Sequence, residues 1–287
     1  MICRFLTALC GAVIFGTVFF AGCGSEYLED KAATELKVAA PNEIGVHIPA
    51  YAADAIAATG GRQLWTKTLK IELDCVVTFY RADGSFYLTR QQYEIEPFSN
   101  SISIFSKEPQ GEYVYQLSAK GFSVLQTGGQ IESKVKPLCG RSFAEAMLFM
   151  TTAAVRFLDE SAMFTRMPSP VRKEGLWYHA YQRVYSVERG IGLVGEGVPI
   201  LQKIVLFYQN RNTRRVDMLW FADMEEERYL GVHGYDYLPT ENHEAGLFER
   251  PGVLIPGKIE LFRTDRDGIL QNRLLEVDVK AGYFTPF

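Results

Sequence analysis

Histidine, cysteine, serine and carboxylate side chains are the groups with which this 287-residue chain could carry out chemistry. Its four histidines show no His-x-x-x-His spacing, and its five cysteines form no Cys-x-x-Cys pair. No serine lies in the Gly-x-Ser-x-Gly sequence that presents a nucleophile on a sharp turn. His233 with Asp236, or His243 with Glu241 and Glu244, are combinations that could hold a metal, but solvated loop residues explain them more simply. The sequence therefore predicts no catalytic residue, no metal ligand and no cofactor.

One enzymatic alternative stays open. Two carboxylates that cleave a glycosidic bond need only lie about 5–9 Å apart in space, and sequence spacing does not reveal such a pair. A hydrolase of the cell envelope is therefore the alternative to a binding protein.

Cys23 has surroundings that suggest a different chemistry. It follows Ala21-Gly22 at the end of an uncharged apolar run, residues 5–20, that is preceded by Arg4. A basic start, an apolar middle and small residues at the end are typical of a secretory signal. The run of about 16 residues is shorter than the roughly 20 that a membrane-spanning helix needs, so a cleaved signal is favoured over a permanent anchor.

The stretch Phe20-Ala21-Gly22-Cys23 resembles the lipobox of bacterial lipoproteins. The resemblance implies that residues 1–22 are removed and that acylated Cys23, the new N-terminus, attaches the protein to a membrane. Two or three acyl chains anchor stably, since each buried methylene contributes roughly 0.8 kcal/mol. The residue after Cys23 is Gly24 and not Asp, which resembles the pattern of lipoproteins that a Gram-negative cell sends to its outer membrane. The resemblance implies that the protein is anchored there and faces the periplasm. An ordinary signal peptide with an incidental cysteine is the alternative.

The composition is that of a folded protein without a nucleic-acid partner. Hydrophobic residues make up 47% and charged residues 22%, and the formal net charge is −4, whereas nucleic-acid binding calls for a basic face. We expect a monomer. Cys75 and Cys139 would be the cysteines left over, and they either pair in an oxidising compartment or, for Cys75, pack as a small apolar side chain.

The chain divides into three predicted parts: the signal at 1–22, a lipidated tether at 23–49 and a folded domain at 50–287. In the domain, residues 69–80 alternate apolar and polar side chains, as in a half-buried antiparallel strand. The polar set, led by Lys70, Glu72 and Asp74, should face water. The apolar set should face a concave interior and comprises Leu69, Ile71, Leu73, Val77 and Phe79.

Further short strands follow at even spacing, broken by Gly, Pro and Asn, which favours an antiparallel meander of about ten or eleven strands. One helix interrupts them at about residues 143–159, with Ser142 as its candidate N-cap. Its apolar stripe includes Phe143, Met147, Met150 and Phe157. The fold class predicted is mainly β with helices (α+β).

Two stretches resemble the LolA/LolB-like superfamily of lipoprotein-localisation proteins. They are AIAATGGRQLWTKTLKIEL, in which Gly60-Gly61 and Trp65 precede the first strand, and LIPGKIELFRTDRDGILQNRLLEVDVKAGYFTPF at the end of the chain. The resemblance implies a half-open antiparallel β-barrel with a helical lid, whose concave face binds acyl chains and so carries or receives lipoproteins.

The predicted ligand cavity combines the five apolar strand residues with the four of the helical stripe. Methionines at 147 and 150 suit a surface that repacks around varied apolar ligands, although, taken alone, they are explained more simply by ordinary core packing. We therefore expect a lipid-anchored envelope protein that binds an acyl chain, a lipid or a lipoprotein. The alternative is a structural or interaction lipoprotein whose barrel is filled by its own side chains.

Overall fold

The computed structural model describes residues 49–108, 111–127, 140–159, 162–185, 204–223, 228–242 and 251–286. The predicted signal peptide, Cys23, Cys139, His243 and all of the tether except Pro49 lie outside these ranges, so the three domain boundaries stay predictions. None of the helices in the described ranges combines the length and the apolar character that crossing a membrane would require.

The first half of the chain forms consecutive antiparallel strands, as the meander prediction requires. They are β1 (Thr68–Tyr80), β2 (Phe86–Glu96), β3 (Ser101–Glu108), β4 (Gly111–Ser118) and β5 (Gly121–Thr127). The turn between β1 and β2 contains Gly84 at φ 82°, a conformation that glycine adopts without strain. Asp83-Gly84, a dipeptide typical of hairpin turns, thus joins β1 to β2.

The second half contributes the remaining strands. The longer ones are β6 (Ala162–Arg166), β8 (Leu176–Tyr185), β9 (Ile204–Asn210), β10 (Val216–Asp223), β11 (Arg228–Tyr235), β15 (Lys258–Thr264) and β16 (Leu270–Pro286). The short ones are β7 (Val171–Lys173), β12 (Leu238–Pro239), β13 (Glu241–Asn242) and β14 (Leu254–Ile255).

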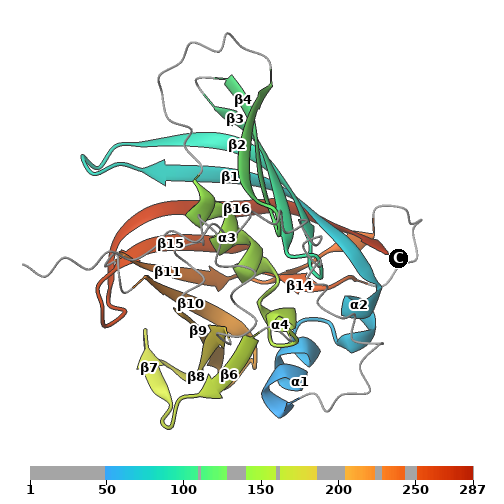
Figure 1. Ribbon diagram of the computed structural model, residues 1–287, viewed down its shortest axis with the longest axis vertical. Helices are drawn as coiled ribbons and strands as arrows, with labels where there is room; N and C mark the ends of the chain where they lie inside the picture. Colours follow the sequence, from blue (N-terminus) through green and yellow to red (C-terminus); the bar gives the residue numbers. More distant parts are fainter. Residues whose placement is uncertain are drawn as a thin grey trace, which may run out of the picture. The chain divides into compact units, whose positions relative to one another are not determined.

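One sheet of fourteen strands joins both halves. Its main order is β5-β4-β3-β2-β1-β16-β15-β11-β10-β9-β8-β6, with β7 beside β8 and β13 beside β16. The first and last of the described strands, β1 and β16, pair antiparallel in the middle of this order. The sheet curls without closing, so the predicted fold class, mainly β with a half-open antiparallel barrel, is confirmed (Figure 1). The expected ten or eleven strands are too few, because β6 and strands of two or three residues carry no visible alternation.

The alternation predicted for the first strand is present from Ile71 to Tyr80. Odd-numbered residues are buried on the face that we call the inner face, and the even-numbered ones are partly exposed on the outer face. Leu69 departs from the prediction because 44% of its side chain is exposed while Thr68 is buried. The register with β16 shifts between Thr68 and Lys70, and such a bulge adds one residue and reverses the facing of those before it.

In the part of the chain that the structure describes, four helices accompany the sheet: α1 (Ala50–Ala57), α2 (Arg62–Lys67), α3 (Arg141–Thr151) and α4 (Ala153–Arg156). The single helix expected at 143–159 is therefore two helices. The helical path breaks at Thr152 (φ −108°, ψ 17°), whose hydroxyl donates to the Leu148 carbonyl, 2.5 Å away. α3 begins at Arg141 after Gly140, so Ser142 is not the N-cap. We call α3 and α4 the lid, and they cross the inner side of the curled sheet (Figure 1).

The residues around Gly60-Gly61 and Trp65 fix the entry into β1. Both glycines have positive φ (115° and 88°), and a Cβ at Gly60 would approach the Val253 Cα to 3.2 Å. Trp65 is fully buried, and its Nε1 donates to the Thr59 hydroxyl at 2.9 Å. This segment therefore ties the first two helices to the base of the sheet.

The facing of β1 gives a matched test. Val77 is fully buried on the inner face, whereas its neighbour Val76 is partly exposed on the outer face. Val77→Thr should lower the free energy of unfolding by about 1–3 kcal/mol, because it buries a hydroxyl without a partner. Val76→Thr should change it by less than about 0.5 kcal/mol. Urea denaturation measures both, and equal losses would contradict the assigned facing.

Candidate ligand-binding cavity

Most residues predicted to line the cavity converge on the inner face beneath the lid. Eight of the nine lie in one buried core cluster, each at most 8% exposed: Ile71, Leu73, Val77, Phe79, Phe143, Met147, Met150 and Phe157. Leu69 is outside it for the reason given above. The burial of these eight is thus confirmed, while their contact with a ligand stays a prediction.

The N-terminal part of the lid packs against the first half of the sheet. The Phe143 ring lies 6.1 Å from that of Phe79 and 6.3 Å from that of Tyr93, measured between ring centres. Farther along α3, Met150 approaches β11 where Gly234 has no side chain. A Cβ at Gly234 would come within 2.8 Å of the Met150 Cε, so this glycine allows the helix to lie close to the sheet.

The C-terminal part of the lid packs against the second half through aromatic rings. The ring centre of Phe157 lies 5.0 Å from Phe164, 5.2 Å from Phe207 and 5.1 Å from Tyr51 of α1. Aromatic pairs at such separations contribute about 0.5–1.5 kcal/mol beyond the area that they bury. The lid therefore bridges the two halves of the sheet across its inner face.

A buried polar group at the end of the lid was not predicted from the sequence. Asp159, just after α4, forms an ion pair with Arg183 of β8, and both side chains are almost fully buried. The guanidinium groups of Arg183 and Arg156 lie over the Phe149 ring, with 5.1 and 5.4 Å to its centre. We call these four residues the latch, because they connect α3, the lid's end and β8. The spacing of these four residues along the chain matches no motif, so the sequence did not predict their contact.

Glu145 is the unusual side chain of the lid. It lies in α3 with 1% exposure, and its Oε1 accepts a hydrogen bond from Arg141 Nε at 3.1 Å. Its Oε2 is buried and has no hydrogen-bond partner among the described residues. Burial raises the pKa of Glu145 to about 7, and the hydrogen bond and charge of Arg141 offset this only in part. A carboxylate in this setting opposes the closed position of the lid.

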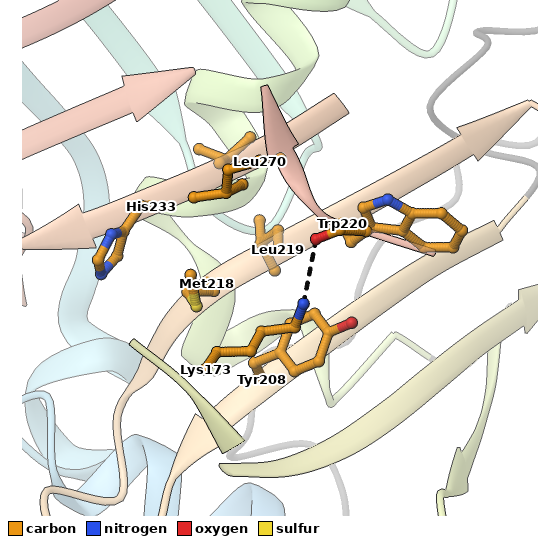
Figure 2. Close-up of a pocket in the computed structure, with 10 residues that line it drawn as sticks. Lys173, Tyr208, Met218, Leu219, Trp220, His233 and Leu270 are labelled. Carbon is orange, nitrogen blue, oxygen red and sulfur yellow. Dashed lines mark hydrogen bonds between the residues drawn. The ribbon is translucent and has the colours of Figure 1, made fainter. Parts of the chain in front are cut away.

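Among the described residues, two hollows lie outside the face that the lid covers. The first, on the outer side of β9–β11, has an accessible volume of about 10 Å³, which is room for about one water molecule and too little for an acyl chain (Figure 2). Lys173 lines it, donating to the Gly268 carbonyl at 3.2 Å and lying over the Tyr208 ring (Figure 2). Burial lowers the pKa of Lys173.

The second hollow is a groove of about 700 Å³ along β1–β4. Its exposed side chains belong to the outer face and mix both charges with polar and aromatic groups: Arg90, Gln92, Phe105, Lys107, Glu112 and Lys280. Acyl chains prefer apolar linings with few polar groups, so this groove fits them less well than the inner face.

Within the described ranges, no three His, Cys, Asp or Glu side chains lie close enough together to hold a metal ion. His179 lies in β8 and His233 lies in β11, so His233 is a strand residue rather than a loop residue. Cys75 is buried on the inner face and is a free cysteine in the structure, and burial raises the pKa of its thiol. Whether it pairs with Cys139 stays a prediction, since Cys139 lies outside those ranges.

Comparison with known proteins identifies the fold but no sequence relative. No known protein-family model matches the sequence, and no curated protein is similar to it. A LolA superfamily protein from Nitrosomonas europaea superimposes with a TM-score of 0.50 at 9% identity, covering 83% of this chain and 93% of that one. A DUF1329 family protein from Desulfovibrio piger gives a TM-score of 0.45 at 10% identity, with 83% and 92% covered. The superposition on the Nitrosomonas europaea protein shows that the chain has a LolA-like half-open barrel fold.

The raised pKa of Glu145 gives a pH-dependent prediction. Between pH 4.5, its ordinary value, and about 7, the native state keeps a proton that the unfolded state loses. The free energy of unfolding should thus fall as pH rises through this range, by on the order of 3 kcal/mol in total. Glu145→Gln should remove this loss.

Urea denaturation of both proteins from pH 4 to 8 measures the difference. The pKa of Asp217 is also raised by burial, but Asp217 is present in both proteins and cancels. Parallel pH curves for the parent and Glu145→Gln would show that Glu145 does not oppose folding.

Proposed function

We propose that this chain binds an acyl chain of a lipid or lipoprotein on its inner face, and that the lid moves aside to admit it. The LolA-like fold supports an apolar-ligand role. The observation that carries the proposal is Glu145, a buried carboxylate on the lid with an oxygen that lacks a partner in the described chain. Burial of this carboxylate destabilises the closed lid, so opening needs less free energy than it would if an uncharged side chain stood in place of Glu145.

An acyl chain that takes the place of the lid can bury the inner face as the lid does. The lid covers the inner face with apolar side chains such as Phe143, Met147 and Met150, which are non-directional contacts. An acyl chain restores the same burial at roughly 25 cal/mol per Å², or about 0.8 kcal/mol per methylene. Polarizable methionines repack readily around such a chain. Binding of this kind involves no covalent step and no catalytic residue.

A second function is favoured by a specific observation. Every side chain of α3 from Phe143 to Thr151 is buried, so the chain's own residues fill the space under the curled sheet. An interior filled in this way is expected of a structural or interaction protein of the envelope that binds no ligand, which we call the assembly module. The two functions differ in whether the lid leaves the inner face.

A variant that weakens the latch distinguishes the acyl-binding function from the assembly module. Phe149→Leu removes the cation–π contacts of Arg156 and Arg183, which contribute roughly 0.5–2 kcal/mol, and should raise the open population. Because apparent affinity scales with the competent fraction, binding of a fluorescent fatty acid should become several-fold tighter. A fluorescence titration measures this effect.

The matched control is Tyr208→Leu. Tyr208 is also a buried aromatic residue under a cation, Lys173, but it packs in a separate cluster on the outer face. This variant should leave fatty-acid affinity unchanged. If the parent, Phe149→Leu and Tyr208→Leu all fail to bind, and no lipid co-purifies with the parent by native mass spectrometry, the assembly module is the better assignment.

We further propose that Cys23 carries the lipid that attaches the protein to the envelope, at the outer membrane in a Gram-negative cell. Cys23→Ser should then leave uncleaved precursor and abolish labelling with a radioactive or clickable palmitate. Gel mobility and labelling measure both effects. A Cys23→Ser protein that is processed normally and still retained in membranes would sink the assignment, without bearing on the inner face.

A further inference from the structure

A group of basic side chains surrounds an exposed tryptophan at one end of the sheet. We call it the basic rim: Arg166 of β6, Arg172 of β7, Trp177 of β8, and Arg211 and Arg214 of the turn between β9 and β10. Trp177 is 49% exposed, and the side chain of Arg214 is 50% exposed. The protein as a whole is acidic, so this concentration of arginines is a local feature.

The strand register brings these residues to one face. Arg172 pairs directly with Trp177, and the Arg211 N–H donates to the Trp177 carbonyl at 3.0 Å. Arg166 pairs with Tyr181, which shares a face with Trp177 because odd-numbered residues of β8 point the same way. The rim therefore continues the inner face of β6–β9 beyond the part that the lid covers.

The turn that carries two of the arginines has a defined shape. The Asn210 side-chain oxygen accepts hydrogen bonds from the N–H groups of Asn212 and Thr213, at 2.9 and 3.3 Å. Such a local turn holds the following residues in a fixed orientation. Arg211 and Arg214 are thus presented on a shaped turn rather than on an open loop.

His179 reports how positive the rim is. Its Nδ1 lies 2.9 Å from Arg166 Nη2. Burial lowers its pKa, and the charges of Arg166, Arg211 and Arg214 lower it further. In the described part of the chain, the Asp54 carboxylate of α1 forms only a long ion pair with the rim, since its Oδ2 lies 4.0 Å from Arg214 Nε. The arginine charges are therefore left largely uncompensated by the described part of the chain.

We propose that the basic rim docks on the anionic headgroups of a lipid bilayer, with Trp177 at the membrane–water interface. Arginine recognises phosphate oxygens with two hydrogen bonds, and tryptophan concentrates at headgroup depth. Each basic residue near an anionic membrane surface contributes about 1 kcal/mol. An acidic protein would satisfy the charges and could also contact Trp177, but the position of the rim beside the start of the folded part favours a bilayer.

The position of the rim in the fold fits this partner. β6, β8 and α1 lie at the same end of the structure (Figure 1). α1 begins at Ala50, so the chain that leads from Cys23 enters the folded part beside the rim. Residues 24–49 allow at most about 90 Å between the two, even fully extended. This second argument rests on the proposed anchor, whereas the charge argument does not.

Fluorescence of the full chain with vesicles tests the proposal. Vesicles contain brominated phosphatidylcholine alone or mixed with phosphatidylglycerol, since bromine quenches a tryptophan that reaches the interface. Trp65 is fully buried, but Trp220 is partly exposed, so the part of the quenching that Trp177→Phe removes is the part that reports on Trp177. We expect quenching on the anionic vesicles, little on the neutral ones, and loss of the quenching in Trp177→Phe.

Charge variants complete the test. Arg166→Glu with Arg211→Glu should raise the phosphatidylglycerol needed for half-maximal quenching by more than about tenfold. Arg263→Glu with Arg266→Glu makes the same change of charge at exposed sites outside the rim. This control should change the phosphatidylglycerol needed for half-maximal quenching by less than about twofold. Equal quenching on both vesicle types, quenching that persists in Trp177→Phe, or equal effects of the two charge variants would overturn the proposal. Fatty-acid binding by Phe149→Leu is a separate readout, so failure of the rim leaves the inner face untouched.

Discussion

The structure depends on one constraint, which is that the inner face of a curled sheet must be covered. The sheet is open between β5 and β6 along its main order, so it cannot bury this face by closing on itself. The direct pairing of β1 with β16 joins the two halves but leaves the inner face in need of a covering element. α3 and α4 fill that role, packing Phe143 on β1–β2 and Phe157 on β8–β9. The close approach of Met150 to Gly234 and the break at Thr152 both follow from fitting a helix into this space.

The covering helix carries both the stabilising and the opposing interactions. Apolar contacts and the latch of Phe149, Arg156, Asp159 and Arg183 hold it on the sheet. Burial of Glu145 opposes this position, because one carboxylate oxygen has no partner among the described residues. In the function that we propose, a lid with both kinds of interaction exchanges with an apolar ligand. The basic rim lies on the continuation of the same face, so a bilayer docked there would lie near the inner face from which an acyl chain would pass.

The sequence predicted the parts of this arrangement that depend on local alternation. Residues 71–80 were assigned to the correct faces because one face of an antiparallel strand is buried and the other is wet. Leu69 was misplaced because a bulge depends on the register with β16, about 200 residues away, and leaves no local pattern. The two-residue strands and the helix break at Thr152 were not predicted, because they too leave no local pattern in the sequence. The latch also stayed hidden, since Asp159 and Arg183 meet only through the fold.

Hydrogen–deuterium exchange of the lid during titration with palmitate tests the central claim most directly. If an acyl chain takes the place of the lid, the amides of α3, residues 141–151, should exchange faster as palmitate is added. Amides of β1, in the middle of the sheet order, should keep their protection and serve as the internal reference. An α3 whose exchange is unchanged or slowed at saturating palmitate would contradict the account, because the helix would then remain on the inner face.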